Sequence, residues 1–273
     1  MNVLPRSLHL LLATACAMTL VGQDACAVEY RFTAEPIYAP DAAREIYKPL
    51  LDYLGRETGE KFVLVTPANY GSYWRNILKP ASTDFSYDEA HFADYRIARS
   101  GFLPLVRTAE PTSYTLLANL DYEGRKPDSL QGKSIATMAA PSLGYALLAQ
   151  FYPNPVEQPR FLSAARSWRD GVQMVFGGEA DAAIVPTWLK DTYPNLAAIQ
   201  TSRTFPGPAV LAAPEVPAEV RDKVRDALLK LGDAPELAGL LLELGISKFV
   251  AAQAGEYAGN RTILEGFYGY KPD

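Results

Sequence analysis

The sequence contains very little cysteine and histidine. Its 273 residues include two cysteines, Cys16 and Cys26, and two histidines, His9 and His91. Both cysteines and His9 lie within the first 27 residues, which have the pattern of an export signal. The chain beyond them therefore has no disulfide and no thiol chemistry. Its single histidine excludes many classes of enzyme, and HExxH, CxxC, GxSxG and P-loop motifs are all absent from the sequence.

The chain also lacks a run of basic residues. It carries 26 Lys and Arg against 31 Asp and Glu, for a formal net charge of −5. A nucleic acid is therefore not expected as a partner. Apolar residues make up 48% of the chain, which is enough to build a core and excludes disorder for most of it. A net negative charge still permits a locally positive pocket for an anion.

Long hydrophobic runs are missing after the N-terminus. Residues 1–27 contain the cation Arg6, an apolar stretch and the small-residue pattern Ala25-Cys26-Ala27. This pattern predicts a signal peptide cleaved after Ala27 and export to the periplasm. The apolar stretch is shorter than the ~20 residues of a membrane-spanning helix. A lipoprotein signal ending at Cys16 is an alternative, although Ala13 stands where such signals favour Leu.

Short apolar strands alternate with amphipathic helices along the rest of the chain, which predicts an α/β fold with largely parallel sheets. In one helix, for example, Ala43, Ile46, Leu50 and Leu54 share a face. The expected strands are 30–33, 61–65, 84–87, 102–106, 114–120, 134–138, 182–185, 197–200 and 209–213. The expected helices are 41–57, 70–78, 88–100, 143–151, 168–176, 218–231, 235–244 and 256–267.

The order of these elements suggests two units with the chain passing out and back. We expect one lobe from residues 28–113 plus 209–273 and a second from 114–208, with a hinge and a cleft between them. Ligands of open α/β sheets bind beyond the carboxyl ends of the strands, near helix N-termini. The corners to inspect are therefore 36–41, 87–91, 139–145 and 167–168.

Two of these corners offer polar side chains that could contact a ligand. Tyr38 could close over a ligand, or it could be a rim aromatic against Pro36 and Pro40. Ser142 could cap the helix that follows it, offer its hydroxyl to an anion, or do both, because a cap lies at the positive end of the helix dipole.

The corner at residues 87–91 is the richest in titratable groups: Tyr87, Asp88, Glu89 and His91. Asp88 is expected as the N-cap of the next helix. His91 could bond an anionic ligand, the two carboxylates could meet a cationic one, or the three could bind a metal ion. A solvated surface is the remaining interpretation. A hydrolytic triad of His91 with Ser86 and Asp84 or Asp88 is disfavoured, because these residues are too close in sequence.

The fourth corner places an aromatic residue at a helix start. Trp168 could stack on a flat or cationic ligand, and Trp188 occupies a similar position after a strand. Packing is the alternative for both. Ser167 and Asp170 have the spacing of a capping box, which supports a helix start there. Arg166 and Arg169 are candidate anion partners or surface cations.

Four motifs resemble those of the phosphate, phosphite and phosphonate receptors of ABC transporters. They are Tyr47-Lys48-Pro49-Leu50-Leu51-Asp52-Tyr53-Leu54, Leu130-Gln131-Gly132-Lys133-Ser134-Ile135-Ala136, Gly178-Glu179-Ala180-Asp181-Ala182-Ala183 and Arg225-Asp226-Ala227-Leu228-Leu229. Their order and spacing match over residues 28–267. The resemblance implies a type 2 periplasmic binding protein that encloses its ligand by hinge closure.

The resemblance also points to site positions and to departures from the family pattern. A hydroxyl-rich loop of the family corresponds here to Pro141, Ser142 and Leu143 before Gly144-Tyr145, so only Ser142 keeps a hydroxyl. Trp168 stands at the position of a family His. Thr187 or Trp188 stands at the position of a family Asp. Glu89-Ala90 replaces a Gly-Pro.

These observations predict a periplasmic solute-binding protein with no enzymatic activity, no cofactor and no bound metal. We expect it to be a monomer that delivers a small ligand, a phosphonate-type oxyanion or a related solute, to the membrane permease of an ABC transporter. A sensor or a carrier of a metal or chelate, with the same fold, is the alternative. The expected ligand contacts are Tyr38, Tyr87, Asp88, His91, Ser142, Gly144, Trp168 and Thr187.

Overall fold

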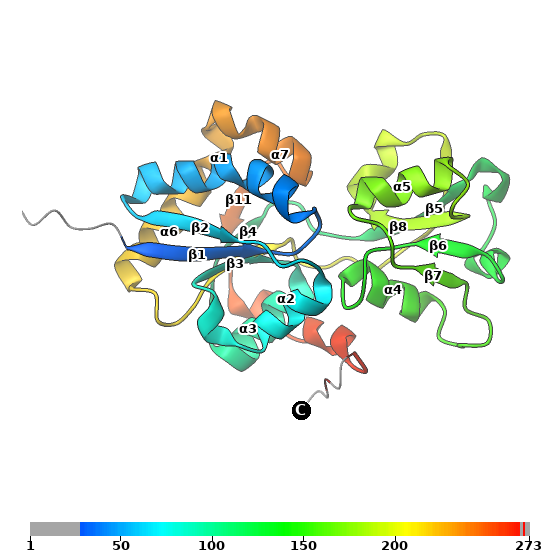
Figure 1. The fold of residues 1–273 in the computed structure, drawn as a ribbon, viewed down its shortest axis with the longest axis horizontal. Coiled ribbons are helices and arrows are strands. Elements are labelled where there is room, and N and C mark those ends of the chain that lie inside the picture. The colour runs from blue at the N-terminus through cyan, green and yellow to red at the C-terminus, as the bar shows by residue number, and fades with distance from the viewer. Residues whose placement is uncertain (1–27, 268–269, 271–273) are drawn as a thin grey trace, which may run out of the picture.

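The computed structural model describes residues 28–267 and Tyr270, which fold into two lobes, each built on its own β-sheet (Figure 1). Residues 1–27, the predicted signal peptide, lie outside the described part of the chain. No helix of the described residues combines the length and apolar character that crossing a bilayer requires.

The first lobe contains a six-stranded sheet in the order β11-β4-β10-β3-β1-β2. Its strands are β1 (Glu29–Ala34), β2 (Lys61–Val65), β3 (Phe85–Asp88), β4 (Leu103–Thr108), β10 (Ala209–Ala212) and β11 (Phe249–Ala251). Its helices are α1 (Pro40–Thr58), α2 (Tyr70–Ile77), α3 (Ala90–Ser100), α6 (Ala218–Lys230) and α7 (Ala238–Leu244). Helices α1 and α7 cover one face of the sheet, and α2 and α3 cover the other (Figure 1).

The second lobe contains a five-stranded sheet in the order β7-β6-β8-β5-β9. Its strands are β5 (Tyr114–Asn119), β6 (Ser134–Ala136), β7 (Arg160–Leu162), β8 (Ala182–Pro186) and β9 (Leu196–Thr201). Helices α4 (Leu143–Phe151) and α5 (Trp168–Phe176) lie on opposite faces of this sheet (Figure 1).

Two segments connect the lobes. The chain passes from β4 to β5 through residues 109–113 and returns from β9 to β10 through residues 202–208. The two segments bond to each other: the Thr112 amide donates to the Phe205 carbonyl at 3.0 Å, and the Phe205 amide donates to the Thr112 carbonyl at 2.7 Å. The connection is therefore a short two-stranded hinge.

The expectation of largely parallel sheets was wrong, because both sheets are mixed. β1 pairs with β2 and β3 in parallel, as β6 does with β7 and β8, whereas β10, β11, β5 and β9 form antiparallel pairs. The strands next to the hinge account for most of the antiparallel pairs. A strand that enters or leaves a sheet from the other lobe runs against the strands made by local β-α-β crossovers.

Most predicted helices and strands are present, but the C-terminal helix expected at 256–267 is not. That segment forms two short 3₁₀ turns, Ala254–Glu256 and Asn260–Leu264. Gly259, with φ of 86°, interrupts the region in a left-handed conformation that a helix cannot continue. Strands β7 and β11 were not predicted from the sequence, because a run of three residues shows little hydrophobic periodicity.

Candidate functional site

A cavity of about 160 Å³ lies between the two lobes. Both lobes and both hinge segments contribute to its walls. The side chains that give the walls their chemical character are Glu35, Tyr38, Tyr47, Tyr87, Glu89, Glu110, Trp168, Thr187, Trp188 and Glu243. The structure therefore brings four of the predicted ligand contacts, Tyr38, Tyr87, Trp168 and Thr187, to one cavity.

Tyr38 follows β1 and contacts residues of α1 and α7 in its own lobe. Its hydroxyl donates to Glu243 Oε1 at 3.0 Å, and its ring lies edge-on to Tyr47, with centroids 6.5 Å apart. Burial raises the pKa of the Tyr38 phenol, and the charge of Glu243 raises it further. The side chain therefore stays neutral, and its ring forms part of the cavity wall.

Trp168 is the first residue of α5, which Ser167 caps by accepting from the Asp170 amide at 3.1 Å. The indole lies edge-on to the ring of Tyr114, with centroids 5.2 Å apart. It also presses on Gly144, where a Cβ atom would come within 3.0 Å of Trp168 Cη2. Gly144 thus permits the close approach of α4 to the indole and is not itself a cavity residue.

Thr187 lies where β8 ends, next to the hinge. Its hydroxyl oxygen accepts from Ser113 Oγ at 2.8 Å and lies 2.9 Å from Thr115 Oγ1, and its amide donates to the Ser113 carbonyl at 2.8 Å. Thr187 therefore lines the cavity and also ties the second lobe to the hinge.

Ser142 is fully buried and caps α4. Its Oγ accepts from the Tyr145 amide at 3.2 Å and lies 3.5 Å from the Met138 carbonyl. The hydroxyl is thus engaged within the second lobe and does not line the cavity, so the capping role is the one the structure supports.

Asp88 is part of a buried ion pair and does not line the cavity. Its carboxylate accepts from Arg96 Nε at 2.9 Å and from the Tyr73 hydroxyl, and both charged side chains are at most 1% exposed. The expectation that Asp88 caps α3 was wrong: the N-cap is Glu89, without a side-chain cap bond. Strand β3 continues through Asp88 and carries it into the interior, where its charge requires Arg96.

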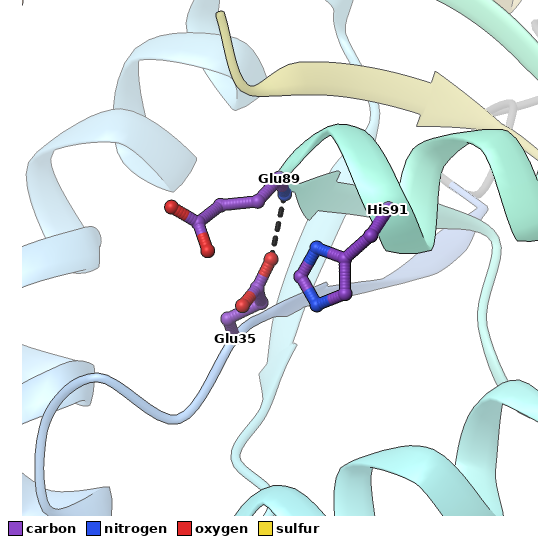
Figure 2. Close-up of side chains that lie close together, drawn as sticks. All are labelled: Glu35, Glu89 and His91. Atoms are coloured by element: carbon purple, nitrogen blue, oxygen red, sulfur yellow. Dashed lines mark hydrogen bonds between the residues drawn. The ribbon is translucent and has the colours of Figure 1, made fainter. Parts of the chain in front are cut away.

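Glu35, Glu89 and His91 form a cluster in which one ligand atom from each residue lies within 4.8 Å of the other two (Figure 2). Glu35 Oε1 accepts from the Glu89 amide at 2.6 Å, and Glu35 Oε2 accepts from the Tyr70 hydroxyl at 3.1 Å. His91 Nε2 lies 3.1 Å from the Pro141 carbonyl, so this nitrogen carries the proton and Nδ1 is a bare acceptor.

Burial dominates the electrostatics of this cluster. It raises the pKa of Glu35 well above its usual value, and the charges of Glu89 and Asp88 add to the effect. Burial also raises the pKa of Glu89 to about 7, against a hydrogen bond from Tyr114 that lowers it. It lowers the pKa of His91 to about 3, so the imidazole is neutral. The cluster thus lacks a positive charge, and its two carboxyl groups hold their protons more tightly than free ones do.

Several contacts join the lobes around the cavity. The Tyr114 hydroxyl donates to Glu89 Oε1 at 2.6 Å, and His91 donates to Pro141. At the opposite rim, Trp188 covers Gly245, the left-handed residue that ends α7. Arg169 lies 5.4 Å from the centre of the Trp188 ring, but this contact is internal to the second lobe. These contacts between lobes hold the structure in a closed arrangement.

A second cavity of about 310 Å³ is also lined by Tyr38. It too is shared between the lobes, with Asn69 and Tyr70 on one side and Ser163 and Arg166 on the other. Arg166 thus faces an interlobe space, whereas Arg169 is 3.7 Å from Glu243 in an ion pair between lobes.

The triad considered from the sequence is not assembled. Asp84 pairs with Arg31 at 2.9 Å and Asp88 pairs with Arg96, so neither carboxylate orients His91.

Three cavity carboxylates were not among the residues predicted from the sequence: Glu35, Glu110 and Glu243. Glu35 comes directly after β1, just as Glu89 comes directly after β3. Because ligands of α/β sheets bind beyond the carboxyl ends of the strands, this position could have identified Glu35 from the sequence. Glu110 lies on the hinge and Glu243 near the end of α7, and no local pattern distinguishes them from surface acids.

The comparisons with known proteins agree with this architecture. Residues 32–257 match the family model described as ABC transporter, phosphonate, periplasmic substrate-binding protein. The chain belongs to this family. None of the curated proteins matches the sequence.

Several solved structures share the fold of this chain. The structure of PhnD1 from Prochlorococcus marinus in complex with methylphosphonate is 11% identical, with a TM-score of 0.73 over 86% of this chain and 97% of that one. A binding protein component of an ABC phosphonate transporter from Pseudomonas aeruginosa is 19% identical, with a TM-score of 0.71 over 87% and 85%. A Xanthomonas citri protein bound to ATP is 15% identical, with a TM-score of 0.65 over 86% and 98%.

The two-lobe periplasmic binding protein fold expected from the sequence motifs is thereby confirmed, as is membership of the phosphonate receptor family. The family consists of substrate-binding components of transporters and not of enzymes.

Proposed function

We propose that this protein captures a small solute between its lobes in the periplasm and delivers it to the membrane permease of an ABC importer. The observation that carries the proposal is the interlobe cavity, whose walls come from both lobes and from both hinge segments. A cavity built in this way opens when the lobes separate and encloses its contents when they close.

The moving bodies in this proposal are residues 28–113 plus 209–273 and residues 114–208, which are joined at the hinge. Tyr38 and Tyr87 from the first body, and Trp168 and Thr187 from the second, are the proposed ligand contacts. Cleavage of residues 1–27 as an export signal and a monomeric state complete the proposal. The family membership supports a periplasmic location and a permease partner.

A second candidate ligand is a metal ion or a chelate, and the cluster of Glu35, Glu89 and His91 is the observation that favours it. Imidazole and carboxylates together suit several divalent transition metals.

Small-angle scattering on the purified protein tests the capture mechanism. Each candidate solute is first screened for a rise in melting temperature, since a ligand that binds only the folded state stabilises it. A solute that raises the melting temperature is then expected to reduce the radius of gyration as well. If every stabilising solute leaves the radius of gyration unchanged, capture by lobe closure is refuted.

A further inference from the structure

The chemistry of the interlobe cavity is unusual for a receptor of oxyanions. Four carboxylates line it, Glu35, Glu89, Glu110 and Glu243, and none of the described residues that line it is Lys, Arg or His. An oxyanion is normally held by converging N–H and O–H donors, often charged ones. Here an anion would meet carboxylates in a poorly solvated space.

Two of these cavity-lining residues have a buried carboxyl oxygen with no hydrogen-bond partner in the described part of the chain. Glu89 Oε1 accepts from Tyr114, but Glu89 Oε2 is buried and has no hydrogen-bond partner. Glu110 Oε1 accepts from the amide and the hydroxyl of Ser247, but Glu110 Oε2 is likewise buried without a partner. An unsatisfied buried acceptor is costly, so both oxygens favour a donor from a ligand.

The neighbouring imidazole adds a third acceptor. His91 is completely buried, and its Nδ1 also lacks a partner among the described residues. Because its other nitrogen faces the Pro141 carbonyl, Nδ1 cannot itself supply a proton to the carboxylates. Glu35, Glu89 and His91 thus gather several acceptor atoms beside the cavity, whose wall includes the two glutamates but not the imidazole (Figure 2).

Aromatic rings form much of the remaining wall: Tyr38, Tyr47, Tyr87, Trp168 and Trp188. The face of an aromatic ring attracts an organic cation, most strongly for tryptophan. The carboxyl groups of the cavity favour a ligand with a positive charge, and their unpartnered oxygens favour one with N–H donors. The aromatic rings can pack against the carbon chain of such a ligand.

We propose that the solute bound in this cavity carries a protonated amine whose N–H groups bond to Glu89 and Glu110, with its carbon chain against the aromatic wall. This inference rests on the proposed receptor function and assigns its ligand class. A quaternary ammonium ion has the charge but no N–H donor, so it leaves both oxygens unsatisfied.

A bare metal ion fits the same residues less well. Both oxygens of Glu35 already accept from the protein, and His91 is not among the residues that line the cavity. Glu110, whose free oxygen also requires a partner, lies outside the three-residue cluster. A cavity of about 160 Å³ with five aromatic rings is also far larger than one ion needs.

Calorimetric titration of the full mature protein tests the ligand class with five probes: ethanolamine, putrescine, choline, methylphosphonate and zinc ion. We expect at least one of the two primary amines to bind and choline to bind at least tenfold more weakly. If neither primary amine binds, or if choline binds as well as they do, the proposal is overturned. Binding of methylphosphonate or zinc alone also overturns it.

Matched variants locate the binding groups. E89Q and E110Q, which keep the side-chain shape, are each expected to weaken amine binding roughly ten- to hundredfold, the range for a hydrogen bond to a charged group. E123Q, at an exposed residue of the second lobe, is the control and is expected to change nothing. Unchanged amine affinity in both E89Q and E110Q refutes the assignment, even if both variants melt below the wild type.

Two outcomes of these titrations separate the ligand class from the receptor function. If methylphosphonate binds and compacts the protein, the receptor function stands and the amine assignment falls. If an amine binds without compaction, the ligand class stands and capture by closure falls.

Discussion

Replacement of Gly245 by alanine should impair closure of the lobes more than it impairs folding. Gly245 ends α7 with φ of 68°, and Trp188 of the second lobe lies directly on it. An alanine Cβ would come within 2.9 Å of Trp188 Cε3, and closer still to Cδ2 and Cε2. The indole, and with it the second lobe, would have to move back by about 1 Å to restore van der Waals separation.

The expected magnitude has two parts. Alanine in the left-handed conformation costs roughly 1–2 kcal/mol of stability, whether the lobes are open or closed. The clash with Trp188 arises only when the lobes close, and overpacking of this kind costs roughly 1–3 kcal/mol. That cost lowers the affinity for an enclosed solute roughly 5- to 150-fold.

Gly59 provides the matched control. It ends α1 with φ of 78°, and a Cβ atom at this position meets nothing within 4 Å. G59A should therefore lose the same backbone stability as G245A but bind and compact like the wild type. The assay is the melting temperature without solute, followed by titration and scattering with a solute that compacts the wild type. If G245A binds that solute and compacts as fully as G59A does, the assignment of Trp188 and Gly245 as a closure contact is refuted.

Three further predictions concern stability. D88A should lower the free energy of unfolding, measured with a chemical denaturant, by about 3–5 kcal/mol, because it leaves Arg96 charged and buried without its partner. A loss under 1 kcal/mol would contradict the buried ion pair. G207A should lower the free energy of unfolding by several kcal/mol, since its Cβ would lie 2.7 Å from the Thr108 carbonyl and closer still to Thr108 Oγ1, where β4 meets the hinge. A variant with wild-type stability would show that the packing at the hinge is looser than described. The wild type should lose stability relative to E89Q as the pH rises from 5 to 8.

The raised pKa of Glu89 sets the direction of this change with pH. Burial raises that pKa to about 7, above its usual value of 4.5, so the folded state holds the proton more tightly than the unfolded state. The associated stability is complete below pH 4.5 and is lost as the pH rises through 7. Across this pH range the free energy of unfolding falls by at most about 3–4 kcal/mol, because the pKa rises from 4.5 to about 7 and one pKa unit corresponds to about 1.4 kcal/mol.

Comparison with E89Q isolates this effect from that of His91, which has the opposite sign. The pKa of His91 is lowered to about 3, so its contribution is present above pH 6.5 and is lost at lower pH. Urea unfolding of both proteins at pH 5, 6, 7 and 8 measures the difference. A difference that does not change with pH would show that Glu89 is not buried as described.

The sequence by itself determined the order of elements and the family. Periodic helices such as α1, and caps such as Ser142 and Ser167, form through contacts within a few residues, so they can be read locally. The same local rules failed at residues 256–267, where Gly259 adopts a left-handed conformation, and at the short edge strands β7 and β11. Edge strands depend on neighbours that are distant in sequence.

The tertiary structure alone decided which side chains face the solute. The segment 87–91 shows this most clearly. Tyr87 and Glu89 line the cavity, whereas Asp88, which lies between them, points into the first lobe and pairs with Arg96. Glu110 and Glu243 join the cavity from the hinge and from α7. A strand sends successive residues to opposite faces, and lobe closure brings together segments that share no local pattern. The sign of the charge in the cavity is therefore a property of the assembled lobes.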